Sequence, residues 1–129
     1  METEIFTLCD HAQDFSGKLV IVGTFDTIAS KDFPCIHPNC SITGRLRFDE
    51  SEIGKHRFKI TIINEENQNV ISPLEGGMDI NKSTAGTYSA INFAITLGQL
   101  KFDKPGRYSI ELFIDEIWKT GLPLILLKS

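Results

Sequence analysis

The chain has 129 residues and a formal net charge of −4 at pH 7, which fits one domain of ordinary globular composition. Hydrophobic residues make up 41% and charged residues 23% of the sequence, which excludes a disordered chain. The excess of acidic residues argues against nucleic acid as the main partner, and no apolar run approaches the ~20 residues of a membrane span.

The first residues, from Met1 to Glu4, are acidic where a secretion signal is basic, and no apolar segment with a cleavage site follows them. The three cysteines are too few, and odd in number, for a disulfide framework. We therefore expect a cytoplasmic protein with one domain over residues 1–129, which needs neither disulfide nor cofactor to fold.

Apolar and polar residues alternate in short blocks, and this period of two predicts strands that are buried on one face. In chain order, the predicted strands are residues 4–10, 18–25, 40–49, 55–64, 70–80, 87–97, 107–115 and 122–127. Block 18–25 is apolar on both faces, which is typical of a central strand. Block 70–80 contains Pro73, which predicts an edge or bulged strand. Residues 49–55 could form one helical turn.

These blocks, separated by polar connections such as residues 81–86, predict an all-β fold. We expect a two-sheet sandwich of seven or eight mostly antiparallel strands. The side chains expected to point inward are Leu19, Ile21, Ile42, Leu46, Phe58, Ile60, Phe93, Ile95, Tyr108, Ile110 and Leu112.

One local pattern favours an immunoglobulin-like sandwich. A turn at Lys104-Pro105-Gly106 is followed by Tyr108 and, two positions later, by the apolar Ile110. This resembles the tyrosine corner that opens one strand of such sandwiches. Ile110 stands where antibody domains carry a cysteine, which agrees with a reducing compartment.

Short motifs along the chain carry a family resemblance. They are Cys9-Asp10-His11-Ala12, the segment from Gly17 to Asp26, Phe33-Pro34, Gly54-Lys55-His56 and Pro105-Gly106-Arg107-Tyr108. In this order and spacing, the chain resembles a bacterial family of small uncharacterised proteins that is known only as a domain of unknown function. The resemblance covers nearly the whole chain. It implies a cytosolic β-sandwich of one domain and supplies no reaction, ligand or catalytic residue.

Cysteine and histidine residues form one candidate site. The five residues are Cys9, His11, Cys35, His37 and Cys40. Zinc takes four such ligands in a tetrahedral arrangement, but the paired C-x2-C spacing of structural zinc sites is absent. Cysteines are also common as small buried apolar residues. We expect ordinary core and surface positions here, with a metal site as the alternative that the sequence leaves open.

A second candidate is a basic patch. Arg45 and Arg47 share one face of a predicted strand, and Arg57 and Lys59 share one face of the next. If the two strands pair as a hairpin, four cations gather on one sheet face, where they could bind an anion or a nucleic-acid backbone. No aromatic residues are interleaved with them on that face of the strands, and Asp49 lies nearby. We expect a solvated strand face, with anion binding as the alternative.

Trp118 follows a predicted strand, and two interpretations of it stay open: an exposed interface anchor, or a lid over the edge of the core. No motif for a nucleophile elbow, a phosphate loop or a zinc hydrolase is present. We therefore expect a non-catalytic binding or scaffolding module that acts through sheet edges and loops. Its partner would be a protein or peptide, or a second copy of the chain bound through edge strands.

Overall fold

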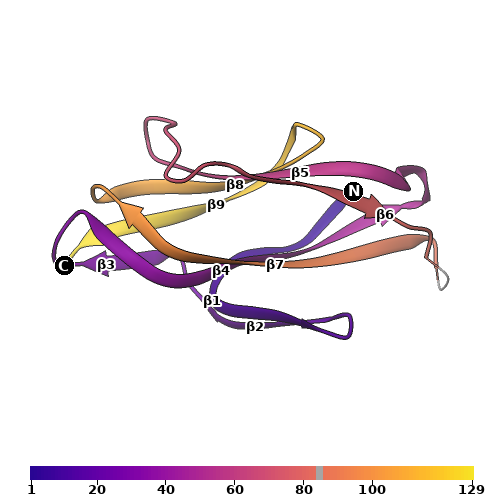
Figure 1. The fold of residues 1–129 in the computed structure, drawn as a ribbon, viewed down its shortest axis with the longest axis horizontal. Helices are drawn as coiled ribbons and strands as arrows, with labels where there is room; N and C mark the ends of the chain where they lie inside the picture. Colours follow the sequence, from indigo (N-terminus) through magenta and orange to yellow (C-terminus); the bar gives the residue numbers. More distant parts are fainter. Residues whose placement is uncertain (84–85) are drawn as a thin grey trace.

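The computed structural model describes residues 1–83 and 86–129, and these residues form two packed β-sheets (Figure 1). The strands are β1 (Glu2–Phe15), β2 (Lys18–Thr24), β3 (Thr27–Ser30), β4 (Cys35–Asp49), β5 (Gly54–Ile63), β6 (Leu74–Ile80), β7 (Tyr88–Phe102), β8 (Gly106–Ile114) and β9 (Ile117–Lys128). One 3-10 turn, η1 (Glu50–Glu52), lies between β4 and β5. Thr84 and Ala85, in the predicted connection 81–86, lie outside the described residues.

The all-β prediction is confirmed, but the number of strands was underestimated. One sheet has the order β2-β1-β4-β7 and the other β3-β9-β8-β5-β6, which makes nine strands in the described residues. The unpredicted strand is β3, which pairs parallel with β9, whereas every other pair of strands is antiparallel. Its four residues are too few for alternation to be recognised. The predicted helical turn before β5 is present as η1, which has a capping box between Asp49 and Glu52.

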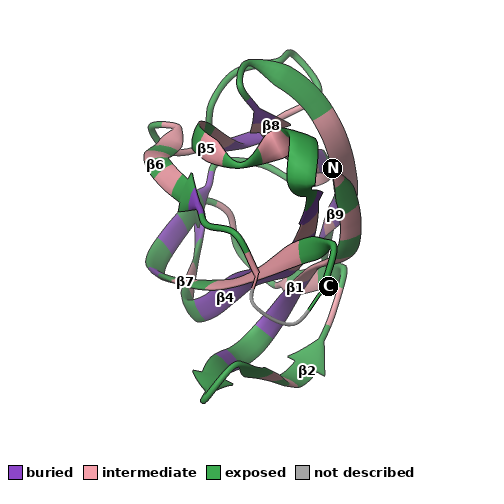
Figure 2. Cartoon of the chain, turned by 90° about the vertical axis from the view of Figure 1, so that its right-hand side faces the viewer, coloured by how far each residue is buried: buried purple, intermediate pink, exposed green. Residues whose placement is uncertain are grey.

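The prediction of a central strand at residues 18–25 is wrong, because β2 is the edge strand of the four-stranded sheet. The β1–β2 hairpin extends below that sheet, on the side away from the five-stranded sheet (Figures 1 and 2). Its tip is held there by the Asn92 side-chain amide, which donates to Asp14 and to the carbonyl of Gly17. Val20 and Val22 remain 42% and 53% exposed. On the other face of β2, Leu19 and Ile21 are partly buried, so the run has one partly buried and one exposed apolar face.

The core lies between the two sheets. Its largest fully buried side chains are Phe48, Phe102, Ile42, Leu46, Ile60, Ile62, Ile80, Ile110, Leu112, Leu124 and Leu126. Of the predicted inward residues, six are buried: Ile42, Leu46, Ile60, Tyr108, Ile110 and Leu112. Phe58, Phe93 and Ile95 pack against the core but are only partly buried. Leu19 and Ile21 are not part of this cluster, because the hairpin that carries them lies on the outer face of a sheet.

The turn before β8 has the geometry of a tyrosine corner. The Tyr108 hydroxyl donates a hydrogen bond of 2.7 Å to the carbonyl of Lys104, four residues earlier. The Tyr108 ring packs edge-on against Phe102, with 5.1 Å between ring centroids. This bond fixes the start of β8 against the end of β7.

We expect Tyr108→Phe to lower the free energy of unfolding by about 1 kcal/mol, because it removes one part-buried hydrogen bond and keeps the ring. Urea denaturation measures the effect. The matched control is Tyr88→Phe, which changes an exposed ring and should leave the denaturation midpoint unchanged. Equal midpoints for the two variants would contradict a role of the Lys104 bond.

His56 connects three elements near the start of β5. Its Nδ1 lies 2.6 Å from Oδ2 of Asp115, in the β8–β9 turn, and its Nε2 lies 2.6 Å from the carbonyl of Glu52 in η1. The Asp115 side chain also accepts a hydrogen bond from the backbone N–H of Arg57. The Asp115 carboxylate, followed by the Glu52 carbonyl, raises the pKa of His56. Both ring nitrogens donate when the imidazole is charged, so the clamp is complete only in that form.

This geometry predicts a stability that depends on pH above the unfolded pKa of His56, 6.5. Because the folded pKa is raised, the clamp contributes fully below pH 6.5, and its contribution is lost as the pH rises through the folded pKa. The advantage of the wild type over His56→Gln should therefore shrink as the pH rises above 6.5, as measured by urea denaturation. Asp115→Asn should likewise reduce the dependence of the free energy of unfolding on pH. A constant difference between wild type and His56→Gln across this range would contradict the clamp.

Candidate functional site

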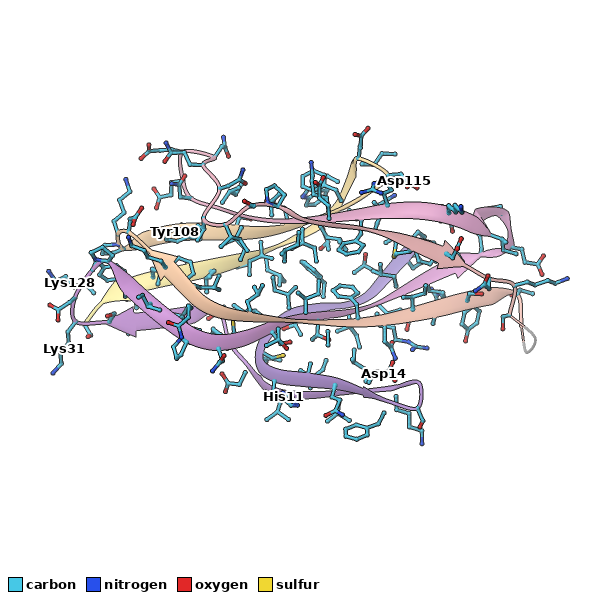
Figure 3. All side chains as sticks on the ribbon, in the orientation of Figure 1. His11, Asp14, Lys31, Tyr108, Asp115 and Lys128 are labelled. Carbon is cyan, nitrogen blue, oxygen red and sulfur yellow. The ribbon has the colours of Figure 1, made fainter. Side chains whose placement is uncertain are left out.

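The cysteine and histidine residues do not form a shared site. Cys9, Cys35 and Cys40 are free and buried, while His11 is exposed on the β1–β2 hairpin, outside the space between the sheets (Figure 3). His37 packs against Phe25, with 5.5 Å between ring centroids. Among residues 1–83 and 86–129, no group of three or more His, Cys, Asp or Glu side chains is placed to hold a metal ion.

Burial governs the chemistry of the thiols. Desolvation raises the pKa of Cys9 and raises that of Cys40 to about 11. The Cys9 thiol donates to the carbonyls of His11 and Ser41, at 3.4 and 3.6 Å. Thiolates are the nucleophiles and metal ligands, so these two side chains are in the unreactive form at neutral pH.

The four basic residues are not on one face, because β4 and β5 do not pair as a hairpin. β4 lies in the four-stranded sheet and β5 in the five-stranded sheet. Arg45 bonds to Glu4 and to the side chain of Asn92, at 3.0 and 2.9 Å. Arg47 contacts Glu4 and lies over the Tyr88 ring. On the other sheet, Arg57 is exposed and Lys59 lies 4.5 Å from the centre of the Phe113 ring.

Trp118 lies on the outer face of the five-stranded sheet. Its indole N–H donates to Glu111, which also accepts from the Ser109 hydroxyl at 2.7 Å. Glu111 alternates along β8 with buried Ile110 and Leu112, which places it on the outer face. The tryptophan is 56% exposed and does not belong to the core cluster, so the structure does not make it a lid over the core. The interface interpretation stays a prediction.

The strongest candidate site is an edge strand. Natural proteins protect sheet edges from pairing with other chains by short strands, proline, bulges or charged side chains. Three of the four edges here have such protection. β3 has only four residues, β2 begins at Lys18 and contains Gly23 with a positive φ of 72°, and β6 follows Pro73 and carries Glu75 and Asp79.

β7 lacks this protection over most of its length. No residue from Tyr88 to Leu100 is charged or a proline. β4 pairs with one side of β7 throughout, and in the described residues no strand pairs with its other side. We refer to residues 90–97 as the β7 edge. Its outward side chains, Ala90, Asn92, Ala94 and Thr96, are uncharged, and Asn92 among them bonds to Arg45 and to the tip of the β1–β2 hairpin.

Side-chain hydrogen bonds add to the strand pairing on the side of the β7 edge that faces β4. Hydroxyl groups of Ser41 and Thr43 donate to the carbonyls of Ile95 and Phe93, at 3.2 and 2.7 Å, in addition to the strand pairing. The inward side chains of Ile91, Phe93 and Ile95 contact the core but are only partly buried. Such a strand is prepared to accept another strand on its free side, which would cover these side chains.

Sequence reasoning identified this segment as a strand but did not place it at the end of a sheet. The alternation at residues 87–97 predicted the inward residues, but it carries no information on which strand ends a sheet. The one signal present was the absence of charge over thirteen consecutive residues in a chain that is 23% charged. That signal indicates either a buried central strand or an unprotected edge, and only the topology separates the two.

The model of a family of unknown function (DUF6941) matches residues 4–127. The chain belongs to this family. No curated protein and no solved structure matches it. In the described part of the chain, no helix has the length and apolar character needed to cross a membrane.

Proposed function

We propose that this member of DUF6941 is a non-catalytic binding module, which takes an extended segment of a protein partner as an added strand at the β7 edge. The observation that carries the proposal is the contrast between this long, uncharged edge and the three protected ones. In strand addition, backbone hydrogen bonds supply affinity, and alternate side chains of the ligand supply specificity.

We further propose an immunoglobulin-like topology, in which β4, β5, β7, β8 and β9 take the places of strands B, C, E, F and G. Three pairings support it: β4 with β7, β5 with β8, and β8 with β9. The Tyr108 corner at the start of β8 supports it as well. In constant-type immunoglobulin domains, strand D lies beside strand E. Here the equivalent side of β7 is the free edge, so an added strand would occupy the place of strand D.

We also propose that the protein works in a bacterial cytosol, as the family resemblance implied. The three free, buried cysteines fit a reducing compartment. A partner segment in that compartment would be an unfolded tail or a loop, because strand addition requires an extended chain with free backbone groups.

The proposal is tested by selecting peptides against the pure protein. A displayed library of twelve-residue peptides is selected on the wild type, and each recovered peptide is then titrated against two variants, Ala94→Lys and Ala29→Lys. Both replace an exposed alanine on an edge strand, the first on β7 and the second on β3. A lysine on an edge strand opposes pairing. Ala94→Lys should weaken binding at least about tenfold, whereas Ala29→Lys should leave it unchanged.

Unfolding curves of the two variants should match that of the wild type, because both side chains are exposed. Recovery of no peptide, or of peptides that bind Ala94→Lys as tightly as the wild type, would contradict strand addition at β7. A wild type that elutes as a dimer, with Ala94→Lys monomeric, would instead identify a second copy of the chain as the occupant.

A further inference from the structure

A cavity of about 140 Å³ lies between the two sheets, directly behind the β7 edge. It is lined by Leu46 of β4, Phe58 and Ile60 of β5, Met78 of β6, Leu112 of β8, and Ile91, Phe93, Ala94 and Ile95 of β7. None of these side chains carries a charge or a hydrogen-bonding group. β6 and β7 are the edge strands of their sheets, so the cavity belongs to the side of the sandwich where both sheets end.

The chemistry of the wall decides what the cavity can accept. A polar group placed there would lose its hydrogen bonds to water and find no partner in the wall. An apolar group would instead gain contacts with side chains that are now only partly buried, namely Phe58, Met78, Ile91, Phe93 and Ile95. The cavity therefore selects an apolar occupant.

The size of the cavity sets the size of that occupant. An engineered protein cavity of about 150 Å³, lined by Leu, Ile and Phe, stays dry and binds benzene. A space of 140 Å³ therefore accommodates a phenyl ring or a branched aliphatic side chain, but not a larger ring system. A whole lipid chain or a drug-sized ligand would need several times this volume.

The position of the cavity connects it to strand addition. A strand added beside β7 continues its pleat, so every second side chain of that strand would point to the same side as Ile91, Phe93 and Ile95. The strand with which it would pair, β7, is uncharged from Tyr88 to Leu100. A charged side chain at the inward positions would thus be buried without a partner, whereas a neutral segment meets no electrostatic penalty.

We propose that this cavity is an anchor pocket for one apolar group up to the size of a phenyl ring. Building on the proposed function, that group is a leucine or phenylalanine side chain of the segment that pairs with β7. The ligand class is thus an extended, uncharged peptide segment with apolar residues at alternate positions and one larger apolar anchor among them.

The pocket is tested with toluene, the side-chain analogue of phenylalanine, followed by methyl NMR of the wild type. Toluene should shift the methyl signals of Ile91, Ile95 and Leu112 and raise the melting temperature in a concentration-dependent way. p-Cresol, which adds one hydroxyl group, should bind roughly tenfold to a hundredfold more weakly. Met78→Trp and Ile91→Phe fill the pocket from two strands, and both should abolish toluene binding. Ile28→Phe, at a partly buried position on the opposite edge strand β3, should retain it.

The anchor is tested with the peptides selected on the wild type. Replacing the largest apolar residue of a peptide by alanine should weaken its binding to the wild type at least tenfold, but leave its binding to Met78→Trp nearly unchanged. An equal loss for both proteins would overturn the anchor while leaving strand addition intact. Absence of toluene binding, or its persistence in both filled variants, would overturn the pocket itself. If no peptide is recovered, strand addition fails, and the toluene titration alone decides whether the pocket binds apolar groups.

Discussion

Replacing Phe102 by alanine should lower the free energy of unfolding by about 3–5 kcal/mol. The Phe102 side chain is fully buried at the end of β7 and packs against Tyr108. Its loss removes the transfer free energy of the ring and leaves a space that the two sheets cannot close. Total stabilities of domains are about 5–15 kcal/mol, so this variant approaches the limit of folding.

Equilibrium denaturation in urea, followed by the fluorescence of Trp118, measures this loss. The matched control is Phe15→Ala, which removes the same ring from the exposed tip of the β1–β2 hairpin. The control should change the stability by less than about 1 kcal/mol. Similar losses for the two variants would show that the core does not lie between the sheets as described.

The second large effect is expected at Gly44, in the middle of β4. A Cβ atom there would lie 2.6 Å from the ring of Phe93 and 2.7 Å from the backbone carbonyl of Ile5. The backbone of β1 cannot move away without breaking its pairing with β4. We therefore expect Gly44→Ala to lower the free energy of unfolding by about 1–3 kcal/mol, through overpacking.

The control for this variant is Gly98→Ala on β7, where an added Cβ meets its nearest atoms at ordinary contact distances of 3.7 and 3.8 Å. It should be neutral within about 0.5 kcal/mol. Thermal unfolding compares the two variants directly. A Gly44→Ala protein with the same melting temperature as the wild type would contradict the close approach of β1, β4 and β7 around Gly44.

Local pattern predicted most of the strands, since alternation follows directly from the burial of one strand face. The pattern also located inward residues of β4, β5 and β8. The turn before Tyr108 resembled a tyrosine corner, and the structure shows the bond from the Tyr108 hydroxyl to the Lys104 carbonyl. These features depend on neighbours in sequence, so a single sequence carries them.

Pairing between distant strands could not be predicted in this way. The expected hairpin of β4 with β5 required only that the two strands be consecutive, but the chain crosses from one sheet to the other at η1. The predicted basic patch depended on that pairing. Because β4 and β5 lie in different sheets, the four basic residues lie on two separate surfaces. Likewise, Val20 and Val22 are apolar because β2 has an exposed apolar face, and composition alone cannot distinguish this from the core.

The candidate site also depends on pairing between distant strands, so only part of it could be predicted from the sequence. An uncharged β7 is readable in the sequence, but its position at the end of a sheet, and the cavity behind it, arise from strand order and from the packing of five strands. The function proposed here therefore rests on topology, and on which backbone groups remain available after folding.

Amide hydrogen exchange of the complex with a selected peptide tests this account most directly. Strand addition predicts that binding slows exchange at alternate amides of residues 90–97, whose N–H groups face the added strand, and leaves the amides of β2, β3 and β6 unchanged. Protection centred on another edge, or on the outer face around Trp118, would contradict the assignment of β7 as the binding edge.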